Sequence, residues 1–175
     1  FIDVLNGLLI ASGNDAAYVL AKNYPGGYEG FVSRMNSMAK EIGLISSNFR
    51  NPSGLDQDGH VSSAWDLGQL TAYAIKNEIF SEIVQKRSEV VYGLGGEYHV
   101  LRTTNQLLGS LPGIKGVKTG YTVQAGEVLV SMVERKGKKV VFVVLKSDDR
   151  FGETKKLVEW VFDNHEWIDF DYSSM

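Results

Sequence analysis

The order of the expected secondary structure predicts an α+β fold, an antiparallel sheet flanked by helices. Three observations support this class. Helical periodicity dominates residues 1–85, two strand pairs are expected between residues 86 and 147, and an amphipathic helix is expected over residues 150–164. Because helices come first, hairpins follow and one helix returns, helices and strands are segregated rather than alternating.

The helical part contains an interrupted segment. The stretch LLIASGNDAAYVLA, residues 8–21, would form one apolar helix without its Ser-Gly-Asn break, so we expect a helix on each side, the second over residues 15–23. An apolar stripe over residues 31–42 marks a further helix that stops at Gly43. The sequence SAWD, residues 63–66, is a capping box for the next helix.

The second half of the chain shows strand patterns. After a short helix expected over residues 77–84, the stretch RSEVVYGLGGEYHVLRT predicts two strands around the glycines of residues 93–96. A longer hairpin is expected over residues 126–147, with its turn at Lys136-Gly137-Lys138. The sequence WIDFDY, residues 167–172, is expected to add a last strand.

Composition excludes several classes of function. The chain has 175 residues, 43% of them hydrophobic, which suits one domain with one core. A net charge of −3 with scattered basic residues gives no footprint for nucleic-acid binding. Without cysteine there are no disulfides, thiolate nucleophiles or cysteine zinc sites, and the three histidines lack metal-binding spacing, so we expect neither metal nor cofactor. No apolar run approaches the ~20 residues of a membrane span.

Two polar motifs interrupt otherwise regular elements. Ser-Gly-Asn at residues 12–14 lies in the break between two helices. Lys-Thr-Gly at residues 118–120 lies just ahead of the long hairpin, where a strand edge presents a cation, a hydroxyl and a free N–H to a ligand. Each has a simpler interpretation: a helix C-cap followed by an N-cap for the first motif, and a solvated lysine at a strand start for Lys118. Either tripeptide alone is weak evidence for a site.

Five sequence blocks that include these motifs occur in the order of a known family. They are VLNGLLIASGNDAAYVLA, FVSRMNSMAKEIGL, FRNPSGLDQDGHVSSAWDLGQL, TTNQLLGSLPGIKGVKTGYTVQAGEVLV and RFGETKKLVEWVF. With them the chain resembles the D-alanyl-D-alanine carboxypeptidases of peptidase family S11, the low-molecular-mass penicillin-binding proteins. The resemblance implies a β-lactamase/transpeptidase-like fold. The similar class A β-lactamases carry Ser-Asp-Asn and a deacylating glutamate, which have no match here.

The family's Ser-x-x-Lys motif, which holds the acylated serine and its base, has no counterpart ahead of Ser12. The resemblance therefore implies a single domain over residues 1–175 that is truncated at its N-terminus, with a helical part of about 1–85 and a sheet and closing helix of about 86–172. SMAK, residues 37–40, fits the pattern but follows Ser12, in a segment that packs as a helix in the family. The chain alone is expected to be inactive and to self-associate through an exposed apolar groove and an open sheet edge.

The resemblance implies acyl transfer through an ester. A serine attacks the D-Ala-D-Ala carbonyl of a peptidoglycan stem peptide, the terminal D-alanine leaves, and water hydrolyses the acyl-enzyme, while β-lactam antibiotics stall at the ester. Such a protein is expected to act in the bacterial cell envelope, outside the cytoplasm. Two alternatives stay open: a non-catalytic module of the same fold that binds peptidoglycan peptides, and a β-lactamase or endopeptidase relative.

Three residues carry catalytic roles that the resemblance implies. Ser12 relays a proton toward the leaving nitrogen, and Asn14 holds the substrate's amide. Lys118 supplies positive potential to the terminal carboxylate and lowers the energy of the deprotonated nucleophile.

Four further residues are expected to bind substrate. Thr119 hydrogen-bonds the carboxylate, and Gly120 lets the ligand approach the backbone. The N–H of Tyr121 forms half of the oxyanion hole. Arg150 begins the last helix near the carboxylate pocket, although an exposed arginine at a helix start is the simpler interpretation.

Three other polar residues are considered for a role. Asn51 and Asp56 resemble family residues that brace the turn-rich loop between the third and fourth helical segments. Glu127 stands where relatives often carry an apolar residue or cysteine, and the sequence predicts no role for it.

Overall fold

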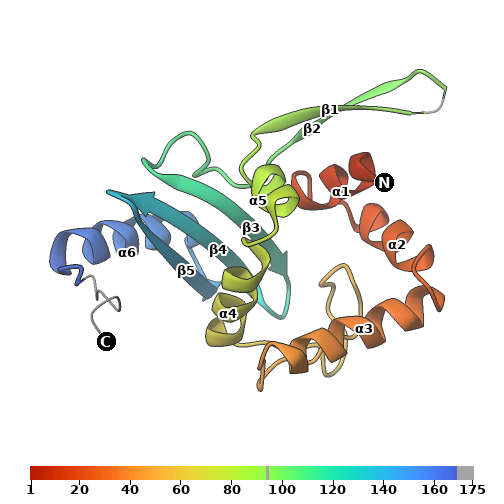
Figure 1. Cartoon of the computed structure of the whole chain (residues 1–175), viewed down its shortest axis with the longest axis horizontal. Coiled ribbons are helices and arrows are strands. Elements are labelled where there is room, and N and C mark those ends of the chain that lie inside the picture. Colours follow the sequence, from red (N-terminus) through yellow and green to blue (C-terminus); the bar gives the residue numbers. More distant parts are fainter. Residues whose placement is uncertain (94, 169–175) are drawn as a thin grey trace, which may run out of the picture.

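A three-stranded antiparallel sheet in the order β3-β4-β5 forms the centre of the structure, and β1 pairs with β2 in a separate hairpin (Figure 1). The computed structural model describes residues 1–93 and 95–168. The helices are α1 (Ile2–Leu9), α2 (Asn14–Lys22), α3 (Gly27–Glu41), α4 (Ala64–Ala74), α5 (Glu78–Val84) and α6 (Arg150–Asn164). The strands are β1 (Ser88–Tyr92), β2 (Tyr98–Arg102), β3 (Ile114–Thr122), β4 (Gly126–Arg135) and β5 (Lys138–Ser147). The predicted α+β class is confirmed.

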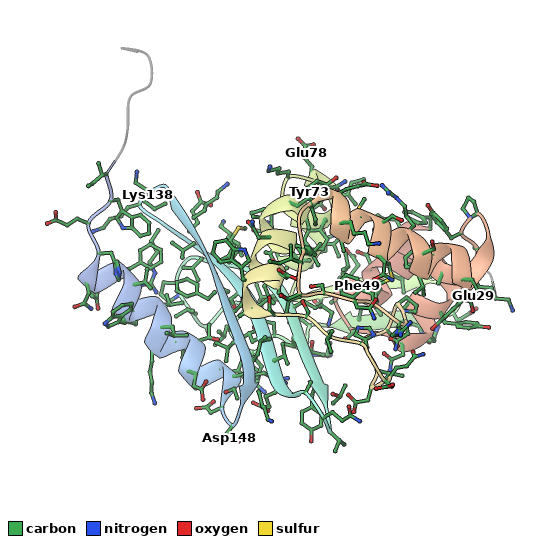
Figure 2. The ribbon with its side chains drawn as sticks, turned by 90° about the horizontal axis from the view of Figure 1, so that it is seen from below. Glu29, Phe49, Tyr73, Glu78, Lys138 and Asp148 are labelled. Atoms are coloured by element: carbon green, nitrogen blue, oxygen red, sulfur yellow. The ribbon has the colours of Figure 1, made fainter. Side chains whose placement is uncertain are left out.

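Helices cover both faces of the sheet. Alternate residues of β4 point to opposite sides, so this one strand contacts helices on both faces. Leu129 and Val133 pack with Val158 of α6 in one buried cluster. Val130, one position along the strand, packs with Val84 of α5 in a second cluster. Figure 2 shows α6 on one side of the strands and the other helices on the opposite side. The sheet is thus a buried central layer whose β3 edge faces the helical part.

The predicted long hairpin forms with a shorter turn than expected. Lys136 and Gly137 have φ values of 51° and 74°, and β5 already begins at Lys138. Two consecutive residues with positive φ close a two-residue hairpin turn whose twist matches that of the strands. The prediction of a three-residue turn was therefore wrong by one position.

Of the two hydrogen bonds in the predicted capping box, only the one accepted by the Ser63 side chain forms. Ser63 Oγ accepts a hydrogen bond from Asp66 N at 3.1 Å, as a helix N-cap does. The fully buried Asp66 carboxylate turns instead to the preceding loop, where its Oδ2 accepts from Ser46 N at 2.8 Å and from Ser47 Oγ at 2.7 Å. These tertiary hydrogen bonds replace the one that a capping box would make to the backbone N–H of Ser63. Asp66 thereby anchors the loop that leads to the candidate site.

The predicted last strand, residues 167–172, lies mainly outside the described residues. Its first two residues, Trp167 and Ile168, belong to no strand. The closing helix α6 has the bounds expected from the sequence, Arg150–Asn164.

An apolar hollow of about 720 Å³ opens between the first three helices. Val4, Leu8 and Leu20 help to line it, and Phe1 at its rim is 87% exposed. Within residues 1–93 and 95–168, β5 pairs with β4 alone, so its other edge is open. The expected self-association through such surfaces stays a prediction. None of the helices described is both long and apolar enough to span a bilayer.

Candidate active site

Six of the seven predicted site residues line one hollow of about 490 Å³. They come from two places in the fold: Ser12 and Asn14 from the α1–α2 break, and residues 118–121 from the edge strand β3. The loop before α4 adds a third wall, including residues 49 and 51–55. Phe49, labelled in Figure 2, lies between the helices and the strands at this wall. The fold therefore joins both polar motifs in one cleft.

Ser12 adopts a strained backbone conformation at the helix break. Its φ is +59°, in the left-handed region that a non-glycine residue rarely adopts. Its hydroxyl caps no helix: the N-cap of α2 is Gly13, without a side-chain cap. Ser12 Oγ instead accepts a hydrogen bond from Lys118 Nζ at 2.6 Å. The interpretation of this motif as two successive caps is wrong for Ser12, whose hydroxyl is directed across the cleft.

Asn14 is the first residue of α2, one position earlier than the predicted start of that helix. Its side chain is exposed at the cleft and makes no hydrogen bond to the described part of the chain. Its amide is therefore free to donate to one ligand group and accept from another.

Lys118 is held in place and partly buried, unlike a solvated lysine at a strand start. Its Nζ donates to Ser12 Oγ and, at 3.0 Å, to the carbonyl oxygen of Thr119. Burial, with a smaller contribution from the positive charge of Arg150, lowers the pKa of Lys118 to about 8. The ammonium form therefore predominates at neutral pH, and the charge is lost as pH rises through about 8.

This pKa leads to a prediction for the pH dependence of the reaction. We expect protonated Lys118 to attract a substrate carboxylate, so for the full-length protein kcat/KM of the expected peptide hydrolysis should fall as pH rises through about 8. In Lys118→Arg, the guanidinium stays charged, and this fall should disappear from the pH profile. A wild-type profile that rises through the same range would contradict the assignment, because neutral Lys118 would then be the active form.

Thr119 has a partner that the sequence analysis did not identify. Its side chain is buried, and its Oγ1 shares a hydrogen bond of 2.5 Å with Thr104 Oγ1. Thr104 follows β2, and the β1–β2 hairpin brings it beside β3. Although Thr104 lies in a recognised sequence block, nothing in local periodicity indicates which strand it would meet. The two hydroxyls form a hydrogen-bonding pair beside Lys118.

Tyr121 presents its backbone to the cleft, and Gly120 lies beside it on β3. A Cβ at Gly120 would meet only the Val128 side chain at 3.6 Å, an ordinary contact, so packing within the protein does not require glycine there. Along an edge strand, backbone groups of alternate residues point the same way. The N–H of Tyr121 therefore points to the same side as the Thr119 carbonyl that accepts from Lys118, as an oxyanion-hole donor requires.

Arg150, the seventh predicted residue, does not line the hollow but supports its β3 wall. As expected, it is the first residue of α6. Its Nη1 donates to the carbonyl oxygen of Gly120 at 2.6 Å, and its side chain is only 16% exposed. The interpretation as an exposed arginine at a helix start is therefore wrong. Glu127, for which the sequence predicted no role, lies 4.0 Å from Arg150 Nε through its Oε2.

The loop before α4 is braced by the two residues expected to do so. Asn51 Nδ2 donates to Leu55 O at 2.9 Å, and Asn51 Oδ1 accepts from Gly54 N at 2.8 Å. Asp56 Oδ2 accepts from Gln124 N at 3.3 Å, which ties the loop to the end of β3. The loop thus has a fixed position relative to the strand.

A second hollow of about 480 Å³ continues the first along β3. Phe49, His60 and Tyr121 line both. Burial lowers the pKa of His60, which favours the neutral ring, and its Nδ1 accepts a hydrogen bond from Arg50 N at 3.3 Å. In the described ranges, no group of three or more His, Asp or Glu side chains is placed to hold a metal ion. The two hollows therefore adjoin along β3 and share one wall.

Ser37, of the second Ser-x-x-Lys pattern, lies on α3 and lines neither hollow. Its hydroxyl donates to Ser33 O at 3.0 Å, within its own helix. Its expected placement on a packed helix, apart from the site, is confirmed.

Comparisons with known proteins identify the family of this chain. The family model for D-alanyl-D-alanine carboxypeptidases, peptidase family S11, matches residues 1–149. The D-alanyl-D-alanine carboxypeptidase DacF of Bacillus subtilis is 33% identical over 167 residues, covering 94% of this chain and 43% of DacF. The chain thus spans less than half the length of this curated relative.

Solved structures of the same class superpose closely. The Streptomyces K15 DD-transpeptidase is 31% identical, with a TM-score of 0.88 over 93% of this chain and 67% of that protein. Penicillin-binding protein D2 of Listeria monocytogenes, solved with ampicillin bound, is 37% identical, with a TM-score of 0.81 over 91% of this chain and 66% of that protein. The transpeptidase-like fold is confirmed, and the chain belongs to the D-alanyl-D-alanine carboxypeptidase family S11.

Proposed function

We propose that this chain forms the substrate-binding wall and part of the proton-transfer apparatus of a serine D-Ala-D-Ala carboxypeptidase. The observation that carries the proposal is the hydrogen bond from Lys118 Nζ to Ser12 Oγ. It joins two motifs that lie 106 positions apart, in a cleft where Ser12 is backbone-strained. The single domain would be completed by a Ser-x-x-Lys segment that is not among residues 1–175.

The proposed reaction is acyl transfer in two steps. The hydroxyl oxygen of the Ser-x-x-Lys serine bonds to the carbonyl carbon, and its proton is passed through Ser12 to the departing amide nitrogen. The C–N bond breaks and D-alanine leaves. The Tyr121 N–H stabilises the oxyanion in this step and in the second, when water hydrolyses the ester.

The charges of the cleft favour a peptide that ends in a carboxylate. Lys118 supplies an ammonium group, Arg150 lies behind the Gly120 backbone, and the Thr119 hydroxyl stands beside them. Peptidoglycan stem peptides ending in D-Ala-D-Ala have this carboxylate and are the proposed substrate. β-Lactams, one of which is bound in the related Listeria structure, are proposed inhibitors.

The proposed substrate determines the proposed place of action. Peptidoglycan is assembled outside the cytoplasmic membrane, so the protein would act in the cell envelope. The specific stem peptide would be selected along the second hollow, where Asp56 and Lys146 offer charges of both signs.

The test is release of D-alanine from a synthetic stem pentapeptide by the full-length protein that contains this chain. We expect release by the full-length protein and none by residues 1–175 alone. Binding of the peptide without turnover would favour a binding module. Cleavage of a cross-linked peptide in place of the pentapeptide would favour an endopeptidase, and rapid turnover of a cephalosporin would favour a β-lactamase.

A further inference from the structure

Glu127, the second residue of β4, makes contacts for which the proposed reaction gives no reason. It is paired with Tyr121 on β3 and with Ser147 on β5. Its Oε2 accepts a hydrogen bond from the backbone N–H of Arg150 at 3.1 Å and lies 4.0 Å from Nε of the same residue. One carboxylate thus contacts both the backbone and the side chain of Arg150.

The backbone contact matters because Arg150 begins α6. The first N–H groups of a helix have no acceptor within the helix. Asp149 Oδ1 accepts from Gly152 N at 2.9 Å, which leaves the N–H of Arg150 to Glu127. The carboxylates of Asp149 and Glu127 therefore both lie at the positive end of the helix dipole. Because Glu127 is on β4, its hydrogen bond fixes where the helix starts relative to the sheet.

The other end of the Arg150 side chain contacts the cleft wall. Its Nη1 donates to Gly120 O at 2.6 Å, and its guanidinium lies over the Phe151 ring at 4.9 Å. Among the described residues its Nε is buried without a hydrogen-bond partner, and the Glu127 carboxylate at 4.0 Å is a negative charge that compensates this part of the guanidinium. Glu127, Arg150 and Gly120 form a chain of contacts from β4 to the backbone of β3.

We propose that Glu127 is a positioning residue that holds the Arg150 guanidinium against β3, so that its charge acts at the carboxylate-binding end of the cleft. The inference rests on the proposed function, because it requires the substrate carboxylate to lie near Gly120. An arginine side chain has many rotamers in solution. By fixing both the N–H and the side chain, Glu127 reduces the number of positions that the charge occupies before substrate binds.

The test compares Glu127→Ala and Glu127→Gln in the full-length protein. For a D-Ala-D-Ala peptide, Glu127→Ala should raise KM about tenfold and change kcat less than about twofold, the loss expected for one charge-assisted hydrogen bond. Glu127→Gln keeps an acceptor for the Arg150 N–H but loses the charge, so its KM should lie between those of wild type and Glu127→Ala.

A second readout separates positioning from a purely structural role. The acylation rate with benzylpenicillin, divided by that with its methyl ester, should fall about tenfold in Glu127→Ala because the ester lacks the carboxylate. The double variant Glu127→Ala/Arg150→Ala should show the same acylation-rate ratio as Arg150→Ala alone, since each substitution removes the same contact between Glu127 and the Arg150 guanidinium. Glu134→Gln, at the far end of the same strand, is the matched control and should leave both readouts unchanged.

Specific results would overturn the inference. Equal losses with benzylpenicillin and its ester, or additive effects in the double variant, would show that Glu127 only stabilises α6. If Glu127→Ala does not fold, the ratio of acylation rates is measured on Glu127→Gln, which is nearly isosteric with the wild-type side chain. Wild-type protein that neither cleaves the peptide nor reacts with penicillin would overturn the proposed function, and the inference with it.

Discussion

Replacing Lys118 with methionine is expected to lower the rate of acylation by benzylpenicillin about 100- to 1,000-fold in the full-length protein, as loss of a preorganised charge in an active site does. Methionine keeps an unbranched apolar side chain but removes the donor that contacts Ser12 Oγ and the Thr119 carbonyl. It also removes the positive charge that attracts the substrate carboxylate. The measurement is the second-order rate constant for formation of the acyl-enzyme, followed by intact mass.

Lys115→Met is the matched control for this substitution. Lys115 lies on the same strand, β3, but does not line the cleft. Its variant should react at a rate close to that of wild type. If Lys118→Met reacted within threefold of Lys115→Met, Lys118 would not be part of the catalytic apparatus.

Replacing Asp66 with alanine is expected to lower the free energy of unfolding by about 3 kcal/mol, because two hydrogen bonds to a buried charged group are lost. The side chain is fully buried, and its Oδ2 accepts from Ser46 N and Ser47 Oγ. Alanine would leave both donors without their acceptor. Urea unfolding of the full-length protein, followed by circular dichroism, measures the change.

Two further variants make the Asp66 result specific. Asp66→Asn keeps one acceptor oxygen and should lose less stability than Asp66→Ala. Asp58→Ala removes an exposed carboxylate of the loop before α4 and should change stability by less than about 0.5 kcal/mol. A loss below about 1 kcal/mol in Asp66→Ala would mean that the loop does not depend on this anchor.

Hydrophobic periodicity predicted best the elements that bury an apolar face. The helix over residues 150–164 was predicted with its observed bounds, since Val158 and its neighbours face the sheet at helical spacing. The same patterning cannot show where one element meets another. Asp66 illustrates the difference: locally it fits a capping box, but the tertiary structure gives its carboxylate two other partners.

The sequence motifs predicted which residues belong to the candidate site, but they did not predict how these residues are arranged in space. Family resemblance indicated that Ser12 and Lys118 belong together, but no sequence pattern gives the 2.6 Å contact between them. Thr104 was missed because its partner Thr119 is reached only after the β1–β2 hairpin folds back. Glu127 was missed because its partner Arg150 lies 23 positions later, beyond the whole of β5.

The central claim is that this chain supplies the substrate-binding wall of a serine acyl-transferase whose nucleophile lies outside residues 1–175. The most direct test is intact mass and peptide mapping after incubation with benzylpenicillin, for the full-length protein and for residues 1–175 alone. We predict that the full-length protein gains the mass of one penicillin on the serine of a Ser-x-x-Lys motif outside residues 1–175, and that residues 1–175 alone stay unmodified. Label on Ser37 or any other serine of residues 1–175, or no label on either protein, would contradict the account.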